Sequence, residues 1–263
     1  MIRAAGHTGT LDPFATGLLV VLVGRATRLA RFLEGEPKRY LATARLGVRT
    51  DTDDPTGAVL GERVPVDAVK DAGIRAALTE FLGRRGQRPP AYSAKHVGGE
   101  RSYRRARRGE AVALAEVEVS VHRIELVSYT PPEVTFRATV SAGTYLRAIA
   151  RDLGDRLGVG AHLVALRREA IGSLRVEEAV PLERIDVAAL RPPCEVLTHL
   201  PAVSVDADAR AALLHGRSVE DPEICAEGKR EGGVVAVLAE RELIAVANRA
   251  DGWLKPVVVL GVP

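Results

Sequence analysis

Residues 117–158 restrict the fold of this chain more than any other stretch. Two strands are predicted, over about 117–127 and 133–141. A helix is predicted from Thr144, a candidate N-cap residue, to Gly158, because apolar side chains recur there at helical spacing. They are Leu146, Ile149, Ala150, Leu153 and Leu157. The pattern predicts a fold that mixes strands and helices.

Shorter patterns of the same kinds run along the rest of the first two thirds of the chain. Residues 50–57 have the composition of a turn. Residues 83–109 are basic and rich in Gly and Pro, with too little apolar content to be buried, which predicts an exposed irregular arm. The other predicted elements are strands over 17–23 and 38–46 and helices over 26–33, 67–82 and 161–168.

The composition changes after Pro181, and Pro192-Pro193 is typical of a linker. Beyond it, a small and mostly β domain is predicted, of a size that folds alone only marginally. Its predicted elements are a helix over 206–215 and strands over 233–238, 242–247 and 256–260. We therefore predict a catalytic domain over 1–181 and a C-terminal domain over 195–263.

Composition excludes several classes of protein. Hydrophobic residues make up 46% of the 263 residues, which is enough apolar material for a core and argues against disorder. No window reaches ~18 consecutive apolar residues. The N-terminus lacks the apolar region of a signal peptide, so we expect a cytoplasmic protein. Cys194 and Cys225 form no CxxC pair, so we expect ordinary thiols and no metal site.

Basic residues are concentrated in one part of the chain. Residues 1–180 hold 28 Lys and Arg against 21 Asp and Glu, whereas residues 181–263 hold 9 against 13. Residues 84–108 hold nine basic residues and one acid, Glu100. A field of that sign attracts polyanions, although a solvated, charge-rich loop is the alternative. The nine are Arg84, Arg85, Arg88, Lys95, Arg101, Arg104, Arg105, Arg107 and Arg108.

Two short strings carry residues suited to chemistry. Gly6–Pro13, GHTGTLDP, is a Gly-rich turn that lacks the ending of a phosphate-binding loop. In the string SAGTYLR, Arg147 stands near the start of the predicted helix, where a cation is unfavourable, so we expect it to have an acidic partner. A carboxylate that a guanidinium keeps ionised can act as a nucleophile, and tyrosines can stack on a planar substrate and move a proton. Asp12, Tyr40, Tyr145 and Arg147 are thus a sensible catalytic set.

With these residues in place, the chain resembles a known family, the bacterial TruB-type tRNA pseudouridine synthases. Six motifs of that family occur in the family's order along nearly the whole chain. They are Gly6–Pro13 (GHTGTLDP), Lys38-Arg39-Tyr40, Pro89–Ala94 (PPAYSA), Gly143–Arg147 (GTYLR), Gly160–Leu163 (GAHL) and Leu166–Arg168 (LRR). Chance is a negligible explanation for six motifs in order.

The resemblance implies the α+β pseudouridine synthase fold, with a mixed, mostly antiparallel sheet and flanking helices. It implies isomerisation of a T-loop uridine of tRNA by base flipping, C1′–N1 cleavage, rotation of the uracil and C5–C1′ joining. No cofactor and no metal are needed. The expected partner is the T stem-loop of tRNA, bound by a monomer that needs no protein partner and no membrane.

The resemblance also assigns roles to residues. Asp12 is the catalytic aspartate, and whether it attacks the sugar or removes its 2′ proton stays open. Tyr40 stacks on the base and moves a proton, Arg147 pairs with Asp12, and Tyr145 helps to shape the pocket. His7 fills the space that the flipped nucleotide leaves. The C-terminal domain resembles an RNA-binding PUA domain, and the basic arm grips the RNA through Arg84, Arg85, Arg88, Lys95, Arg104, Arg105, Arg107 and Arg108.

Two departures from the family pattern matter. Family members carry a segment with a Lys-Pro-x-Gly-x-Thr-Ser-type motif ahead of GHTG, whereas five residues precede Gly6 here. A catalytically impaired tRNA-binding protein is therefore the alternative, and a relative that works only inside a guide-RNA complex is a third hypothesis. Glu169 stands where the family tends to have Thr.

Overall fold

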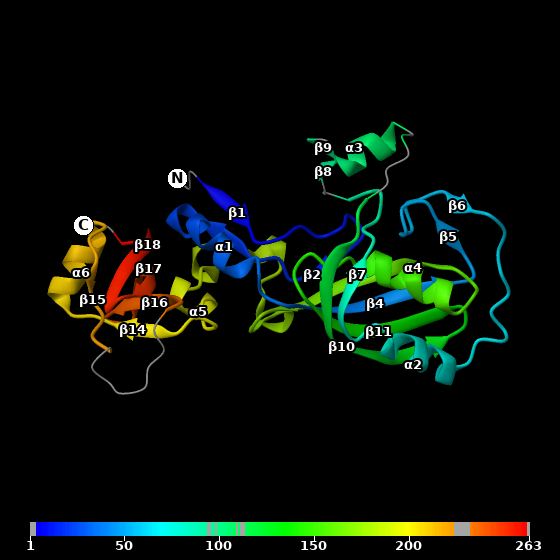
Figure 1. The fold of residues 1–263 in the computed structure, drawn as a ribbon. Helices are drawn as coiled ribbons and strands as arrows, with labels where there is room; N and C mark the ends of the chain where they lie inside the picture. Colours follow the sequence, from blue (N-terminus) through cyan, green and yellow to red (C-terminus); the bar gives the residue numbers. More distant parts are fainter. Residues whose placement is uncertain are drawn as a thin grey trace. The chain divides into compact units, whose positions relative to one another are not determined.

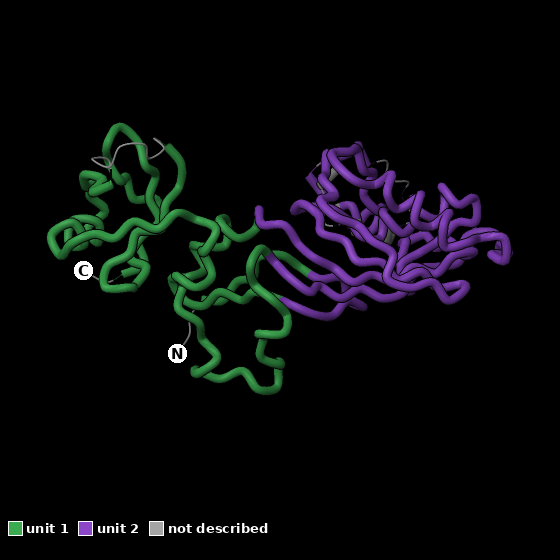
Figure 2. Tube along the Cα trace, turned by 90° about the horizontal axis from the view of Figure 1, so that it is seen from below, with its two compact units in different colours: residues 1–10, 19–34, 172–263 green, residues 11–18, 35–171 purple. Residues whose placement is uncertain are grey.

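The structure of the protein is a computed structural model, and it describes residues 4–93, 96–97, 99–108, 110, 114–223 and 232–261. Its packing divides into two compact units (Figure 2). The first unit comprises residues 1–10, 19–34 and 172–263, and the second comprises residues 11–18 and 35–171. Each unit is therefore built from segments that lie far apart in the sequence.

A mixed sheet forms the centre of the second unit (Figure 1). Its strands follow the order β12-β4-β11-β10-β7, each antiparallel to its neighbour, and β2 pairs parallel with β12. The expected mixed, mostly antiparallel sheet is confirmed. The bounds are β2 Thr16–Gly17, β4 Lys38–Leu46, β7 Gly83–Gln87, β10 Val117–Thr130, β11 Glu133–Val140 and β12 Ala161–Ile171.

Two helices, α2 (Asp71–Thr79) and α4 (Leu146–Arg156), pack on one face of this sheet (Figure 1). The alternation along β4 and β11 points every second side chain into that core, including Ala42, Phe136 and Ala138. The predicted apolar face of α4 meets them. Its buried members are Leu146, Ile149, Ala150 and Leu153.

A glycine lets α4 approach the start of β12 closely. A Cβ atom on Gly154 would lie 2.2 Å from the backbone nitrogen of Ala161, so no larger residue fits there. Smaller elements complete the unit. They are β5 Arg49–Thr50, β6 Val59–Leu60, β8 His96–Val97, β9 Glu100–Arg101 and α3 Ser102–Arg107.

The first unit holds a five-stranded sheet in the order β14-β16-β17-β18-β15. Helix α6 (Ala207–Leu214) packs on one apolar cluster of this sheet. A second cluster joins Leu22, Leu29 and Leu33 to Val246 and Val258, so residues 19–34 belong to this core. The strands are β14 Ala202–Ser204, β15 Val219–Glu220, β16 Val234–Ala239, β17 Glu242–Ala250 and β18 Trp253–Val259.

The remaining elements of the first unit are short. Strands β1 and β3 form an antiparallel pair. The bounds are β1 Ala5–His7, β3 Val21–Val23, α1 Ala30–Leu33, β13 Leu174–Arg175 and α5 Pro193–Val196, with 3₁₀ helices at Gly24–Leu29, Val176–Glu178, Leu182–Arg184 and Val187–Ala189. Within the described ranges, no helix is long and apolar enough to cross a membrane.

The structure corrects several predicted elements. The helix over 161–168 is wrong, because Ala161–Ile171 is strand β12. Two register irregularities, at Leu163/Ala165 and Arg168/Ala170, hide the two-residue period in the sequence. The strand predicted over 17–23 is split into β2 and β3, which belong to different units.

Two further expectations about local structure are wrong. Thr144 is not the N-cap of α4: that position is Tyr145, and the Thr144 hydroxyl donates to the carbonyl of Ser141 at 2.9 Å. The arm over 83–109 is not wholly irregular, because it begins with β7, an edge strand paired with β10. Although β7 has few apolar side chains, its backbone pairs with β10, because ladder hydrogen bonds join main-chain groups whatever the side chains are.

Candidate active site

The carboxylate of Asp12 lies in the turn before β2 and receives two parallel hydrogen bonds from Arg147. Nε of Arg147 donates to Oδ2 and Nη2 donates to Oδ1, both at 2.9 Å. The acidic partner expected for Arg147 is therefore confirmed as Asp12. This two-pronged geometry fixes both the position and the orientation of the carboxylate. The Asp12 side chain remains 30% exposed, so a substrate can reach it.

The other donors of Arg147 also have acceptors. Nη1 donates to the carbonyl of Thr52 at 3.0 Å and lies 3.4 Å from Oδ2 of Asp54, and Nη2 donates to the carbonyl of Tyr92 at 3.1 Å. A guanidinium has five N–H donors, and Arg147 makes four hydrogen bonds in addition to its ion pair with Asp54. Because Arg147 is only 4% exposed, these contacts leave it little freedom to move.

Asp54, in the turn that the composition of residues 50–57 predicts, is the second carboxylate beside Arg147. Its Oδ1 accepts hydrogen bonds from the Thr52 hydroxyl at 2.7 Å and from the Thr56 hydroxyl at 2.6 Å. Asp54 is therefore held by the turn on one side and by Arg147 on the other. One buried cation thus lies between two carboxylates, and only Asp12 is accessible to solvent to a substantial degree.

Tyr145 occupies the N-cap position of α4, and the side chain of Gln87, at the end of β7, binds its backbone. Oε1 of Gln87 accepts from the Tyr145 amide at 2.8 Å, and Nε2 of Gln87 donates to the Tyr145 carbonyl at 3.2 Å. The amide is one of the donors that a helix start leaves unpaired. Burial raises the pKa of the Tyr145 phenol, whereas the nearby Ser93 hydroxyl and the charge of Arg147 oppose that rise.

Tyr40 lies on β4, directly opposite Arg168 on β12. Burial raises the pKa of Tyr40, and the charge of Asp12 adds to the rise. Arg168 acts against it through its positive charge and a hydrogen bond to the phenol. Asp12, Tyr40, Tyr145 and Arg147 therefore form one electrostatic group within the second unit.

The other predicted contact residues are placed less tightly. His7 lies in β1 of the first unit, where its Nδ1 accepts from the amide of Gly9 at 3.3 Å. Lys95 lies outside the described residues. Arg88 and Arg104 are exposed, and Arg107 is the last residue of α3.

Glutamates neutralise part of the basic arm. Arg84 pairs with Glu118 at 2.5 Å, and Arg108 pairs with both Glu100 and Glu110 at 2.7 Å. Arg105 also pairs with Glu110, and Arg85 lies 4.5 Å from the ring centre of Phe81. Glu110 and Glu118 follow residue 108 in the sequence, so the excess of basic residues over 84–108 does not include these two partners.

Sequence reasoning missed the residues that hold the set together. Arg168, Asp54 and Gln87 are buried and polar. Asp54 lies in an Asp-rich string and Arg168 in a family motif, but neither string says which side chain points inward. Gln87 lies inside the basic stretch over 84–108, and no sequence pattern there indicates that its side chain is buried or binds the start of α4.

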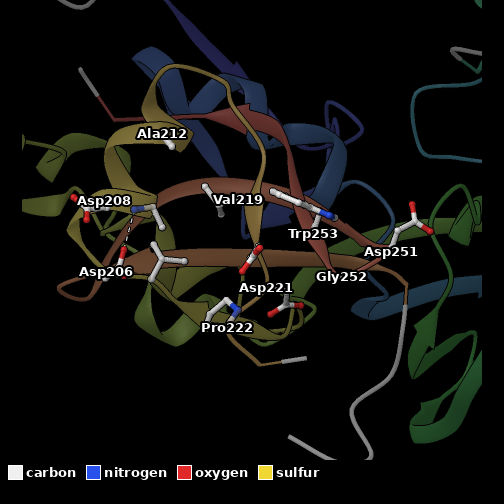
Figure 3. A pocket seen from close by; sticks show the side chains of 12 residues that line it. Asp206, Asp208, Ala212, Val219, Asp221, Pro222, Asp251, Gly252 and Trp253 are labelled. Atoms are coloured by element: carbon white, nitrogen blue, oxygen red, sulfur yellow. Dashed lines mark hydrogen bonds between the residues drawn. The ribbon is translucent and has the colours of Figure 1, made fainter. Parts of the chain in front are cut away.

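A cavity of about 700 Å³ in the first unit does not suit an RNA backbone (Figure 3). Trp253 and Val219 line it together with carboxylates that include Asp206, Asp221 and Asp251. Negative side chains repel phosphate groups. No predicted site residue lines this cavity. In the described part of the chain, no group of three or more His, Cys, Asp and Glu is placed to hold a metal ion.

Comparisons with known proteins agree on one family. Residues 1–146 match the model of the TruB family pseudouridylate synthase N-terminal domain, and residues 147–193 match that of the tRNA pseudouridylate synthase B C-terminal domain. A tRNA pseudouridine synthase B of Burkholderia pseudomallei is 43% identical over 97% of this chain and 87% of its own length. One of Xanthomonas campestris is 45% identical over 84% of this chain and 75% of its own.

Solved structures give a similar fold at lower identity. A chain in the structure of an H/ACA ribonucleoprotein bound to a substrate RNA containing 2′-deoxyuridine has a TM-score of 0.73 and 26% identity. A chain in a Cbf5–Nop10–Gar1 complex has a TM-score of 0.70 and 27% identity. Each alignment covers 99% of this chain and 77% of the other.

Proposed function

This chain belongs to the TruB family and is an isomerase that converts uridine to pseudouridine in tRNA, and we propose that its target is a uridine of the T loop and that Asp12 is its catalytic residue. The observation that carries the catalytic proposal is the paired geometry of Asp12 and Arg147. A buried guanidinium binds both oxygens of this carboxylate and fixes its orientation, yet the Asp12 side chain is 30% exposed and open to a substrate.

The target base must leave its stack before any of these side chains can reach it. Asp12 then either attacks C1′ or removes the 2′ proton, and the C1′–N1 bond breaks. After the uracil rotates, C5 bonds to C1′, C5 loses its proton and N1 gains one, so the reaction is an isomerisation with no net transfer. Tyr40 is the group that we assign to the C5 proton, and Tyr145 shapes the pocket wall. His7 is assigned to the space that the flipped nucleotide leaves.

The basic arm is proposed to bind the phosphates of the T stem through the arginines predicted from the sequence. Residues 1–181 are proposed as the catalytic domain and residues 195–263 as a PUA-like RNA-binding domain. We further propose that the protein works in the cytoplasm as a monomer without a guide RNA or protein partner. Its 43–45% identity to tRNA pseudouridine synthase B, against 26–27% to chains of ribonucleoprotein complexes, supports that proposal. The named relatives give no support to the catalytically impaired alternative.

Release of tritium from RNA labelled at C5 of uridine tests the proposal, because C5 loses its hydrogen only if it bonds to C1′. A T-arm hairpin is the substrate, and the same hairpin with cytidine at the target position is the control. We expect Asp12→Asn to abolish release, since the amide keeps the shape but cannot act as an anionic nucleophile or base. RNA binding by this variant stays within a few-fold of wild type.

Two results would contradict parts of this proposal. Wild-type protein that releases no tritium from the T-arm hairpin but acts on another tRNA hairpin would move the target away from the T loop. Asp12→Asn with activity within about tenfold of wild type would remove Asp12 from the catalytic role.

A further inference from the structure

Arg168 is the largest of the fully buried side chains in the described residues, at 1% exposure. A buried guanidinium is costly unless its charge and donors are compensated. Arg168 lies on β12 between two strands: it is the register partner of Tyr40 on β4 and of Gly17 on β2. Its surroundings are therefore the two segments that carry the proposed catalytic residues.

The segment that bears Asp12 is tied to Arg168 by backbone and side chain. Nε of Arg168 donates to the carbonyl of Leu18 at 2.7 Å, and the amide of Leu18 donates to the carbonyl of Arg168 at 2.8 Å. Gly17, with φ of 100°, permits this approach, because a Cβ atom there would lie 2.3 Å from the Arg168 carbonyl oxygen. Residues 16–18, which follow Asp12 closely in the chain, are thus held against β12.

The same guanidinium hydrogen-bonds the phenol of Tyr40. The charged groups that act on Tyr40 are Arg168 from β12 and Asp12 from the preceding segment, and they act in opposite directions on its pKa. Arg147 from α4 is bound to Asp12, so it partly offsets that carboxylate. On β11 the register partner of Tyr40 is Ala138, which carries no charge.

We propose that Arg168 is a positioning residue for the isomerisation: its guanidinium, itself anchored on the carbonyl of Leu18, holds the phenol of Tyr40 in place and stabilises the phenolate of Tyr40. This inference rests on the proposed role of Tyr40 in moving the C5 proton. A phenolate is a far better base than a phenol, and a fixed positive charge beside it favours the anion without any rearrangement. Arg168 lies beside Tyr40 on the neighbouring strand β12 and acts through it.

The test compares Arg168→Met, Arg168→Lys and a matched control, Arg167→Met. Arg167 is the preceding residue of β12 and is exposed, so its replacement by Met changes the same charge on the same strand. Single-turnover tritium release is measured from about pH 6 up to the highest pH at which the protein and the RNA stay intact, because burial raises the pKa of Tyr40 above its ordinary value of about 10. Equilibrium RNA binding is measured in parallel.

We expect Arg168→Met to lose about tenfold in rate at neutral pH for each unit by which the Tyr40 pKa rises. Its rate should recover toward high pH, so the profile moves in the alkaline direction, while RNA binding changes little. Arg168→Lys should restore part of the rate, because it keeps the charge but lacks the planar fork. Arg167→Met should keep the wild-type profile.

A double-mutant cycle with Tyr40→Phe separates this role from a merely structural one. If Arg168 acts through Tyr40, Arg168→Met adds no further loss in the Tyr40→Phe background. Equal losses in both backgrounds, or a rate that falls by the same factor at every pH, would overturn the proposal.

Ultraviolet titration of the tyrosines gives a readout that does not depend on activity. The Tyr40 transition is identified by its disappearance in Tyr40→Phe, and we expect it at higher pH in Arg168→Met than in wild type. An unchanged transition would contradict the proposal even in an active enzyme. Inactive wild-type protein would instead count against the proposed function. If Arg168→Met does not fold, the same comparison is made with Arg168→Lys, for which we expect a smaller shift in the same direction.

Discussion

Nη1 of Arg151, on α4, lies 2.9 Å from Oδ2 of Asp53, in the turn that also carries Asp54. Asp53 has a φ of 58°, and its side chain is only 12% exposed. Burial raises the pKa of this carboxyl to about 6, and the charge of Arg151 opposes the rise without cancelling it. The ion pair therefore holds the turn to α4 at a desolvation cost.

The raised pKa of Asp53 has a definite consequence for stability. The folded state holds the Asp53 proton more tightly than the unfolded state, so this group stabilises the fold below about pH 4 and loses that contribution as pH rises to about 6. Two pKa units correspond to about 3 kcal/mol. We expect Asp53→Asn to flatten the pH dependence of the unfolding free energy by up to that amount, measured by urea titration. Asp67→Asn, at an exposed aspartate, is the control and should change nothing. If the unfolding free energy of Asp53→Asn depended on pH as steeply as that of the wild type, this result would contradict the raised pKa of Asp53.

Arg147→Lys should impair chemistry far more than RNA binding. An ammonium has three donors and cannot hold both oxygens of Asp12 while also reaching Asp54, Thr52 and Tyr92. We expect a loss of about 10²-fold in single-turnover rate, as is common when a reacting group is misplaced. Arg156→Lys, on the same helix, is the control and should stay near wild type. A variant that loses only affinity for RNA would separate Arg147 from the positioning of Asp12.

Parts of this site could be predicted from the sequence because they follow from local rules. Helix-dipole electrostatics at the start of α4 was enough to predict an acidic partner for Arg147. The strand predicted over 38–46 is likewise confirmed as β4, whose alternate residues Ala42, Ala44 and Leu46 are buried in the core. Each of these two patterns involves residues that lie close together in the sequence, and both predictions are confirmed.

The features that could not be predicted depend on residues far apart in the sequence. Arg168 interacts with Tyr40 only because β12 pairs with β4, and two irregularities in β12 conceal that strand. Glu110 and Glu118 neutralise arginines of the arm from outside the charged window. Residues 19–34 join the core of the first unit by packing against Val246 and Val258, which lie more than 200 positions away in the sequence. A local sequence pattern cannot predict contacts at that separation.

Glu169, the departure from the family motif, is expected to stabilise the sheet. Its carboxylate accepts two hydrogen bonds from Arg137, at 2.8 and 3.1 Å, and pairs with Arg39 at 3.0 Å. Those hydrogen bonds lower the pKa of Glu169, so its contribution is present above the ordinary glutamate pKa and is lost as pH falls through the folded-state value. We expect Glu169→Thr to lower the unfolding free energy at neutral pH by about 1–3 kcal/mol, with a smaller loss near pH 3. Equal losses at both pH values would show that packing, and not charge, accounts for the effect.

The pairing within the arm predicts that a glutamate restrains RNA binding. Glu110 pairs with both Arg105 and Arg108, so phosphates must compete with it for these side chains. We expect Glu110→Gln to strengthen binding to a T-arm hairpin and to steepen the slope of log K against log salt, by roughly 0.7–0.9 for each additional phosphate contact. Replacing Arg104, Arg105, Arg107 and Arg108 by Ala should flatten the slope by up to ~3.

Filter binding at several salt concentrations measures both slopes, and single-turnover tritium release at saturating enzyme serves as the control. The rate should stay nearly constant in both variants, because Asp12 and Arg147 are untouched. Glu133→Gln removes an acid that pairs with Arg45 on the sheet, away from the arm, and should leave the slope at the wild-type value. If the slope of the quadruple variant were also unchanged, the arm would not contact phosphates, and the RNA-binding surface would have to lie elsewhere, with residues 195–263 the next region to mutate.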